Sequence, residues 1–368
     1  MRTVLTLFIM LLAAPSFAAE QHAEQVRARP TLAQAVTDGV AYLVKTQNPD
    51  GSWGIATETR GTEIYSLVPG SHDAFRIGTT ALCVMALREA GEKGAHDRGV
   101  EHLIRYGQAR RDQGDLMYNI WAHTYSVQTL SIELKHKKDE VRIKAAVEWH
   151  LDRLKRYETY IGGWNYYDFD AKTQQPSMGP TSFGTAAALV ALKDAKEAGI
   201  DVPQKMIERA VRRVEEMRLP GGSYLYSSDL KYHPRHPANK IRGSIGRTQA
   251  CNFALWTWGS PKVGVEQVNA DLESFFQEHN FIAMGRKRIW PHESWYATAP
   301  YYYYFGHYYS ARLLEKLGDD GKKRFGERLA AQIMPFQEPD GSWWDYAMWG
   351  YHKPYGTAFG IMTLMRCR

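Results

Sequence analysis

Two nearly identical phrases near the two ends of the chain decide the fold: Gln47-Asn48-Pro49-Asp50-Gly51-Ser52-Trp53 and Gln337-Glu338-Pro339-Asp340-Gly341-Ser342-Trp343. Pro-Asp-Gly favours a tight turn, because proline presets φ and glycine accepts the left-handed conformation. The tryptophan that follows brings a large apolar surface and one N–H group. Each phrase follows an amphipathic helical stretch, so we expect it to clamp the end of one helix against the start of the next. Its recurrence indicates internal repetition.

Weaker copies of the phrase occur between these two. Gly162-Gly163-Trp164 and Gly222-Ser223-Tyr224 each follow a helical run, with tyrosine replacing tryptophan in the second. Two further positions, Asp115–Tyr118 and Arg288–Trp290, lack the glycine pattern. The aromatic residues at 53, 118, 164, 224, 290 and 343 divide the chain into six units. Each unit is long enough for two helices of ordinary length.

The helical runs alternate in character along the chain. Thr79–Ala90 and Gly184–Ala195 are apolar all round, which is typical of buried helices, whereas Glu140–Tyr157 and Gln204–Met217 carry many charges on one face. Residues 55–77 are expected to form a long irregular segment. No run of alternating strands is found, so the sequence predicts an all-α protein.

The pattern resembles the squalene-cyclase and protein-prenyltransferase repeat family, whose QW motif reads Gln, a short spacer and Gly-x-Trp after a helix that carries an aromatic residue. The matching residues are Tyr42, Gln47, Gly51 and Trp53 in one copy and Gln337, Gly341 and Trp343 in the other. The resemblance implies an α/α toroid of six inner and six outer helices around a central cavity, over residues 28–368. The stretch Gly246–Cys251, followed by Tyr301–Tyr309, resembles secreted bacterial members without an assigned activity.

The N-terminus has the pattern of an export signal. Residues 1–18 contain a positive Arg2, an apolar run over 4–14 and a small-x-small site at Ser16-Phe17-Ala18, which predicts a cleavable signal peptide and a periplasmic or secreted protein. Residues 19–27 are expected to be a flexible segment. The apolar run is too short to span a bilayer, and no later segment predicts an integral membrane helix. Three cysteines do not make a disulfide framework.

The sequence lacks the catalytic motifs that the resemblance brings with it. Proton-initiated cyclases of the family use Asp-x-Asp-Asp, and here the nearest string, Asp168-Phe169-Asp170-Ala171, has no third carboxylate. The prenyltransferase zinc ligands and the Cys-x-Glu-Gln thioester are absent too. No pattern predicts a metal or a cofactor. A formal charge of +6 without a basic helix or a known motif does not indicate nucleic-acid binding.

Polar and aromatic residues recur near the starts of the predicted inner helices, which converge on one mouth in a toroid. We expect a site there, because helix N-termini favour anions and concave mouths bind ligands. The candidates for acid–base chemistry are His72, Asp73, His123, Tyr125 and His307. The candidates for ligand binding are Arg76, Asn119, Arg247, His292, Glu293, Tyr301, Tyr304 and Tyr308. An inner helix has one face toward the cavity. If Tyr303, Ser310, Leu314 and Leu317 pack outward, then some of the remaining residues must face the cavity: Tyr301, Tyr304, Tyr308 and Arg312.

Each candidate also has a structural interpretation. His123 fits a satisfied core histidine, Asp73 a helix cap, and Arg76 and Arg247 ion pairs.

Three functions stay open. The first is a toroid that binds an apolar, isoprenoid-like ligand, with catalysis undecided. The second is a lyase acting on an anionic polysaccharide, with a His or Tyr base and an Arg or Asn neutraliser. The third is a non-catalytic recognition protein of the cell envelope.

Overall fold

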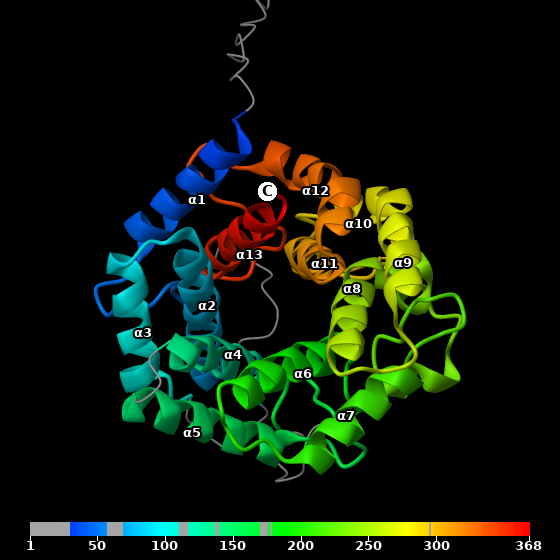
Figure 1. The fold of residues 1–368 in the computed structure, drawn as a ribbon, viewed down its shortest axis with the longest axis horizontal. Coiled ribbons are helices and arrows are strands. Elements are labelled where there is room, and N and C mark those ends of the chain that lie inside the picture. Colours follow the sequence, from blue (N-terminus) through cyan, green and yellow to red (C-terminus); the bar gives the residue numbers. More distant parts are fainter. Residues whose placement is uncertain are drawn as a thin grey trace, which may run out of the picture.

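The computed structural model describes residues 30–56, 69–109, 117–136, 140–169, 176, 179–293 and 296–368. Within these residues the protein is an α/α toroid, a closed ring of inner helices surrounded by outer helices, with no β-strand (Figure 1). The inner helices are α2 (Pro69–Ala90), α4 (Ile120–His136), α6 (Ser182–Glu197), α8 (Ile241–Thr257), α11 (Tyr302–Leu317) and α13 (His352–Arg366). The expected signal peptide and the segment 19–27 lie outside the described residues.

The outer helices are α1 (Leu32–Thr46), α3 (Gly94–Tyr106), α5 (Val141–Tyr157), α7 (Gln204–Glu216), α9 (Val265–Gln277) and α12 (Asp319–Ile333). Short elements complete the described chain: α10 (His279–Gly285) and the 3₁₀ turns η1 (Ser228–Tyr232), η2 (Pro237–Asn239) and η3 (Met334–Phe336). The alternation read from the sequence is confirmed. In α6 almost every residue is buried, whereas α7 buries only Met206, Ile207, Ala210 and Val214. An inner helix needs apolar groups all round because it packs on both sides.

The two terminal QW phrases use the same hydrogen bonds. The indole Nε1 of Trp53 donates to the carbonyl of Leu43 at 2.7 Å, and that of Trp343 donates to Ile333 at 3.0 Å. Each tryptophan backbone N–H donates to a threonine hydroxyl of the following inner helix, at 3.0 Å. Each tryptophan therefore joins the outer helix before it to the inner helix after it, as the turn chemistry predicts.

Trp164 repeats this pattern, with Nε1 donating to Leu154 and N–H to Thr185. Tyr224 keeps only the backbone bond, from its N–H to Ser244, and its hydroxyl donates to Asn252. The other two predicted positions are wrong. Tyr118 turns toward the centre of the ring and Trp290 is more than half exposed. Neither has the glycine turn that swings an aromatic ring back between two helices.

Closure of the ring is explicit in the last motif. The side chain of Gln337 donates from Nε2 to the carbonyl of Ala35 in α1, at 2.8 Å, as Gln47 does to Ala95 in α3. Gly39 of α1 lies so close to Trp343 that an added Cβ would stand 2.8 Å from the indole. The first outer helix thus packs beside the last repeat (Figure 1).

One boundary differs from the sequence-based expectation in a way that matters for the site. The structure begins α2 at Pro69, within the segment 55–77 that was expected to be irregular. The residues between Pro69 and Thr79 include Gly70, Ser71 and Gly78, which depress the helical pattern. They fold as helix because Ala74, Phe75 and Ile77 bury their side chains. This extra length carries α2 down to the mouth of the ring.

A candidate ligand site in the central cavity

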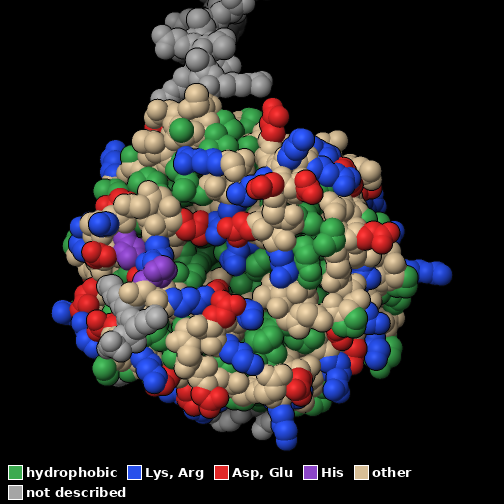
Figure 2. Space-filling model, viewed as in Figure 1, with side chains coloured by type: hydrophobic (Ala, Val, Ile, Leu, Met, Phe, Trp, Pro, Cys, Tyr) green, Lys and Arg blue, Asp and Glu red, His purple; other side chains and the backbone are tan. Residues whose placement is uncertain are grey.

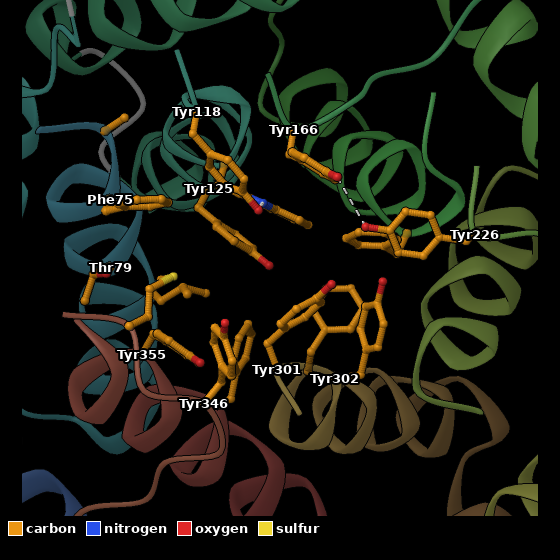
Figure 3. Close-up of a pocket in the computed structure, with 18 residues that line it drawn as sticks. Phe75, Thr79, Tyr118, Tyr125, Tyr166, Tyr226, Tyr301, Tyr302, Tyr346 and Tyr355 are labelled. Carbon is orange, nitrogen blue, oxygen red and sulfur yellow. Dashed lines mark hydrogen bonds between the residues drawn. The ribbon is translucent and has the colours of Figure 1, made fainter. Parts of the chain in front are cut away.

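The centre of the ring encloses a cavity of about 130 Å³. Its wall comes from the N-terminal halves of inner helices and from the loops that precede them (Figure 3). Among the described residues, those that line it carry no formal charge. They are Ala74, Phe75, Gly78, Thr79, Leu82, Tyr118, Trp121, Tyr125, Tyr166, Phe183, Tyr226, Tyr301, Tyr302, Phe305, Tyr346, Met348, Tyr355 and Phe359. The prediction that inner-helix starts converge on one mouth therefore holds for the aromatic residues.

The aromatic rings pack edge to face and in offset stacks, which holds them in place. Tyr118 stacks on Tyr166 with ring centroids 4.9 Å apart, and Phe183 meets Tyr302 edge-on at 5.0 Å. Trp121 lies 5.8 Å from Phe183 and is stacked with it. Such pairs stabilise the fold by about 0.5–1.5 kcal/mol each beyond their burial. The wall is consequently a preformed apolar surface.

The tyrosine-rich segment at the start of α11 has residues on both sides of the wall, and the sequence predicted only some of their positions. Tyr301, Tyr302 and Phe305 face the cavity, whereas Tyr303 faces outward and donates its hydroxyl to the carbonyl of Gln332 in α12. Tyr301, a candidate from the sequence, thus lies in the wall, and Tyr303 packs outward. Tyr302 and Phe305 were missed, because six tyrosines in nine residues carry too little periodic contrast for the helical phase to be read.

Tyr304 and Tyr308 do not line the cavity, which corrects their assignment as ligand-binding residues. The N–H of Tyr304 donates to Oδ2 of Asp345 at 3.1 Å, and the ring is buried behind the wall. Tyr308 accepts a hydrogen bond from Arg312 at 2.9 Å, one turn further from the mouth.

His123 and His307 are also away from the cavity wall. The Nδ1 of His123 lies 3.0 Å from the Nδ1 of His150 in α5, and the Nε2 of His307 lies 3.0 Å from the Nε2 of His279 in α10. Both pairs sit between the inner and outer rings and are buried. Burial lowers the pKa of His150 to about 3 and of His279 to about 4, so these imidazoles are neutral. The positions are those of core histidines and not of acid–base groups at the mouth.

Asp73 and Arg76 form an exposed ion pair at 2.9 Å on the first turns of α2, on the side that faces α3. His72 packs edge-on against Trp349 at 4.6 Å, and its Nδ1 lies 3.3 Å from the Tyr351 hydroxyl. These three residues are near the mouth but outside the aromatic wall. Their expected gathering with His123 and His307 into one cluster does not occur.

Asn119 is buried and anchors the loop before α4. Its Nδ2 lies 3.4 Å from Oδ2 of Asp168, whose other oxygen accepts from the Met117 N–H at 3.0 Å. Tyr125 lines the cavity as expected, stacked on Trp121 with centroids 5.6 Å apart. Asp168, which the sequence offered only as an incomplete cyclase motif, is thus a structural carboxylate in this loop.

Arg247, predicted as a ligand contact, lies immediately behind the wall. Its guanidinium donates to the backbone carbonyls of Gly243, Tyr224 and Ala238 at 2.7–3.0 Å. Its Cζ stands 5.4 Å from the ring centroids of Tyr226 and of Tyr302. The side chain is fully buried. It therefore places a positive charge against the back of two lining residues.

His292 lies in the same region, edge-on to Tyr226 at 5.1 Å. Its Nδ1 faces the carbonyl of Ala297 at 3.0 Å, and Nε2 has no partner among the described residues. Burial, aided by Arg247, lowers the pKa of His292 to about 4 and keeps it neutral. Glu293 lies beside Tyr296; burial and the charge of Glu293 raise the pKa of that phenol to about 12.

A buried carboxyl group that sequence reasoning missed lies behind the opposite wall. Asp345 accepts a hydrogen bond from the hydroxyl of Tyr355, a lining residue, at 2.7 Å. Burial raises the pKa of Asp345 to about 6. The signal available in the sequence was its place two residues after Trp343, where a QW turn meets the next inner helix.

No known family profile matches the sequence, and no curated protein matches it. Solved structures share its architecture. The cellobiose 2-epimerase from Bacillus thermoamylovorans B4167 matches with a TM-score of 0.59 and 9% identity, covering 90% of this chain and 98% of the epimerase. An inactive alpha-1,6-mannanase variant from Salegentibacter sp. HEL1_6, in complex with alpha-1,6-mannotetrose, matches with a TM-score of 0.57 and 11% identity. The match covers 92% of this chain and 98% of the mannanase.

A type II terpene cyclase from Scytonema, in complex with geranylgeranyl dihydroxybenzoate, matches with a TM-score of 0.49 and 13% identity, covering 91% of this chain and 97% of the cyclase. At such identities the likeness extends to the fold alone. The epimerase and the mannanase show that the toroid is shared by proteins outside the squalene-cyclase-like group, which is therefore one of several toroid groups that this chain resembles.

Proposed function

We propose that the protein binds an apolar, isoprenoid-like ligand in the central cavity. The observation that carries the proposal is the composition of the wall, in which aromatic and aliphatic side chains from most of the inner-helix repeats meet without a charged side chain among the described lining residues. Preformed apolar cavities with a few polar groups are the usual form of a small-molecule site. Burial of the ligand's apolar surface supplies the affinity.

The polysaccharide-lyase alternative finds less support in this geometry. A lyase needs a base beside the sugar carbon and a cation or amide against the uronic carboxylate. Of the candidates for these roles, Tyr125 lines the cavity and could act as the base. The other candidates lie outside the described wall, in the contacts given above: Asn119, His123, Arg76 and Arg247. A glycosidase needs two carboxyl groups facing the sugar, and no described lining residue supplies one.

The proposal is tested by titrating the mature protein with farnesol and, separately, with a galacturonate oligosaccharide, following the intrinsic fluorescence to which Trp121 contributes. We expect saturable quenching with farnesol and no change with the oligosaccharide. Saturation by the oligosaccharide and not by farnesol would favour the lyase alternative and overturn the proposal.

Export is a separate proposal that rests on the leader pattern alone. Cleavage after Ala18 would place the toroid in the periplasm or outside the cell, where isoprenoid lipids of the envelope are within reach. N-terminal sequencing of the protein recovered from the periplasm tests it, since a mature chain that starts at Ala19 is expected. None of the helices in the described residues is both long and apolar enough to cross a bilayer.

A further inference from the structure

The hydroxyl of Tyr302 is a hydrogen-bond donor that the protein leaves unused. It is buried, and no described residue lies within hydrogen-bonding distance of it. Figure 3 shows this hydroxyl and that of Tyr301 pointing toward Tyr226 across the cavity. A buried polar group without a partner costs free energy, and such groups in native structures usually await a water or a ligand. A ligand in the cavity would supply the acceptor that the Tyr302 hydroxyl lacks.

Arg247 strengthens this donor from behind. Its guanidinium lies 5.4 Å from the Tyr302 ring and from the Tyr226 ring, and no ion pair of Arg247 is found among the described residues. A positive charge held against an aromatic face draws electron density from the ring and makes its hydroxyl a better donor. Burial and the neighbouring Tyr226 raise the pKa of Tyr302 well above its ordinary value, an effect that Arg247 only partly offsets. The hydroxyl thus stays protonated.

Two other hydroxyl groups of the wall already have acceptors. That of Tyr226 points to the hydroxyl of Tyr166 at 3.4 Å, and that of Tyr355 donates to Asp345 at 2.7 Å. The proton of Tyr355 is therefore committed to a protein carboxylate, in contrast to the proton of Tyr302. Tyr302 therefore has a proton to donate to a ligand, whereas Tyr355 donates its proton to the protein.

The surroundings of Tyr302 are apolar. The ring of Phe183 lies 5.0 Å from it and that of Phe305 lies 6.2 Å from it. An ammonium group would be repelled by Arg247, and a diphosphate would need several cationic donors that the described wall does not supply. An uncharged oxygen acceptor on an apolar body satisfies both the hydroxyl and its neighbours.

We propose that the ligand of this cavity carries a hydrogen-bond-accepting oxygen, such as a carbonyl, at one end of an apolar body, and that the Tyr302 hydroxyl donates to that oxygen. The inference rests on the proposed binding of an apolar ligand and adds the chemical class and orientation of that ligand. Its acceptor end lies at the Tyr226–Tyr302 side, in front of Arg247, and its apolar body extends along Phe183 and Phe305.

The test compares three probes with one isoprenoid skeleton: methyl farnesoate, which has a carbonyl acceptor, farnesene, which has no polar end, and farnesylamine, which is cationic. Dissociation constants are measured by fluorescence titration of the wild type. We expect methyl farnesoate to bind about 3–10-fold more tightly than farnesene, the factor that one hydrogen bond supplies. Farnesylamine is expected to bind more weakly than farnesene.

Two variants locate the donor. Tyr302→Phe removes the unused hydroxyl and keeps the ring, so the fold is retained and the preference for methyl farnesoate is expected to vanish. Tyr309→Phe is the matched control, because Tyr309 lies on the same helix and its buried hydroxyl also lacks a partner, but it is not part of the described wall. It should keep the preference.

The outcomes separate the two proposals. Equal binding of methyl farnesoate and farnesene by the wild type would overturn the acceptor inference and leave apolar binding intact. Tightest binding of farnesylamine would overturn it too. A preference that survives in Tyr302→Phe, or that disappears in Tyr309→Phe, would show that the donor lies elsewhere. If none of the three probes binds, both the inference and the proposed function fail.

Discussion

The two ends of the central ring differ sharply in chemistry. At the N-terminal ends of the inner helices the wall is aromatic and uncharged among the described residues. At the C-terminal ends, charged side chains of both signs surround the centre, on the face seen in Figure 2. There Arg366 of α13 donates to Oε1 of Glu89 in α2 at 2.7 Å and lies 3.0 Å from Glu315 of α11. Lys135 of α4 bridges Asp194 and Glu197 of α6.

The difference follows from the helices themselves. The C-terminal end of a helix carries a partial negative charge, so cations such as Arg366, Lys135 and Lys316 are favoured there. The carboxylates that pair with them join neighbouring inner helices around the ring. The charged end thus ties the repeats together, whereas the aromatic end forms the proposed ligand site. Substitutions at the two ends should separate stability from ligand affinity.

The largest effect is expected from Arg366→Ala at the charged end. This substitution leaves Glu89 without its partner in a half-buried environment and leaves Glu315 with Arg312 alone, which costs about 3 kcal/mol of unfolding free energy. Urea denaturation measures the loss. The affinity for farnesol should stay at the wild-type value, and a large loss of affinity would mean that the two ends are not independent.

The next effect concerns pH at the aromatic end. Asp345 titrates near 3.8 when unfolded and near 6 when folded, so protonation favours the folded state. Its contribution to stability is complete below about pH 3.8 and is lost as the pH rises through 6, a change of about 2–3 kcal/mol.

Asp345→Asn removes this titration. The stability of the wild type relative to the variant should therefore fall between pH 4 and pH 7.5, as measured by thermal or urea unfolding across that range. A stability difference independent of pH would show that the carboxyl titrates normally.

A smaller effect on stability, with a clear effect on binding, is expected from Phe305→Leu in the wall. Loss of the ring should cost about 1.5 kcal/mol or less and weaken farnesol binding several-fold, because the ligand loses apolar contact. Phe325→Leu is the matched control, since Phe325 is also buried but belongs to outer helix α12, away from the described wall. It should lose similar stability and keep its affinity. Equal weakening by both variants would contradict the assignment of the cavity.

The smallest effect is a pH dependence at the charged end. The His96 Nε2 lies 2.9 Å from Glu133 and its Nδ1 lies 2.8 Å from Asp97. Burial acts to lower the pKa of His96, but these carboxylates outweigh it and raise the pKa above 6.5. Burial acts to raise the pKa of Glu133, and the hydrogen bond from His96 outweighs it and lowers the pKa below 4.5.

The pair is therefore fully stabilising between about pH 4.5 and 6.5. The contribution of His96 is lost as the pH rises through its raised folded pKa. Unfolding measured from pH 6 to 9 should show a shallower decline in His96→Gln than in the wild type. An identical slope would mean that His96 does not bind an extra proton in the folded protein.

The sequence by itself determined the helix junctions at the QW phrases, and its resemblance to the QW-motif family implied the closed ring. A QW phrase acts over short distances along the chain: Trp343 meets a carbonyl ten residues earlier and a threonine fourteen residues later. Tight-turn chemistry fixes such contacts locally, so the junctions at Trp53, Trp164 and Trp343 and the alternation of apolar and charged helices follow from the order of residues alone.

Only the tertiary structure decided what faces the cavity. Tyr302 lines it and Tyr304 does not, because the rotation of α11 is set by the helices packed around it and not by a segment in which six of nine residues, 301–309, are tyrosine. His123 became half of a buried pair because His150, on another helix, met it there. Arg247 acquired its place behind Tyr226 and Tyr302 in the same way. These contacts join residues far apart in the chain. Burial, which shifts the pKa of a side chain, depends on the packing of the whole ring, as does the choice of side chains that face the cavity.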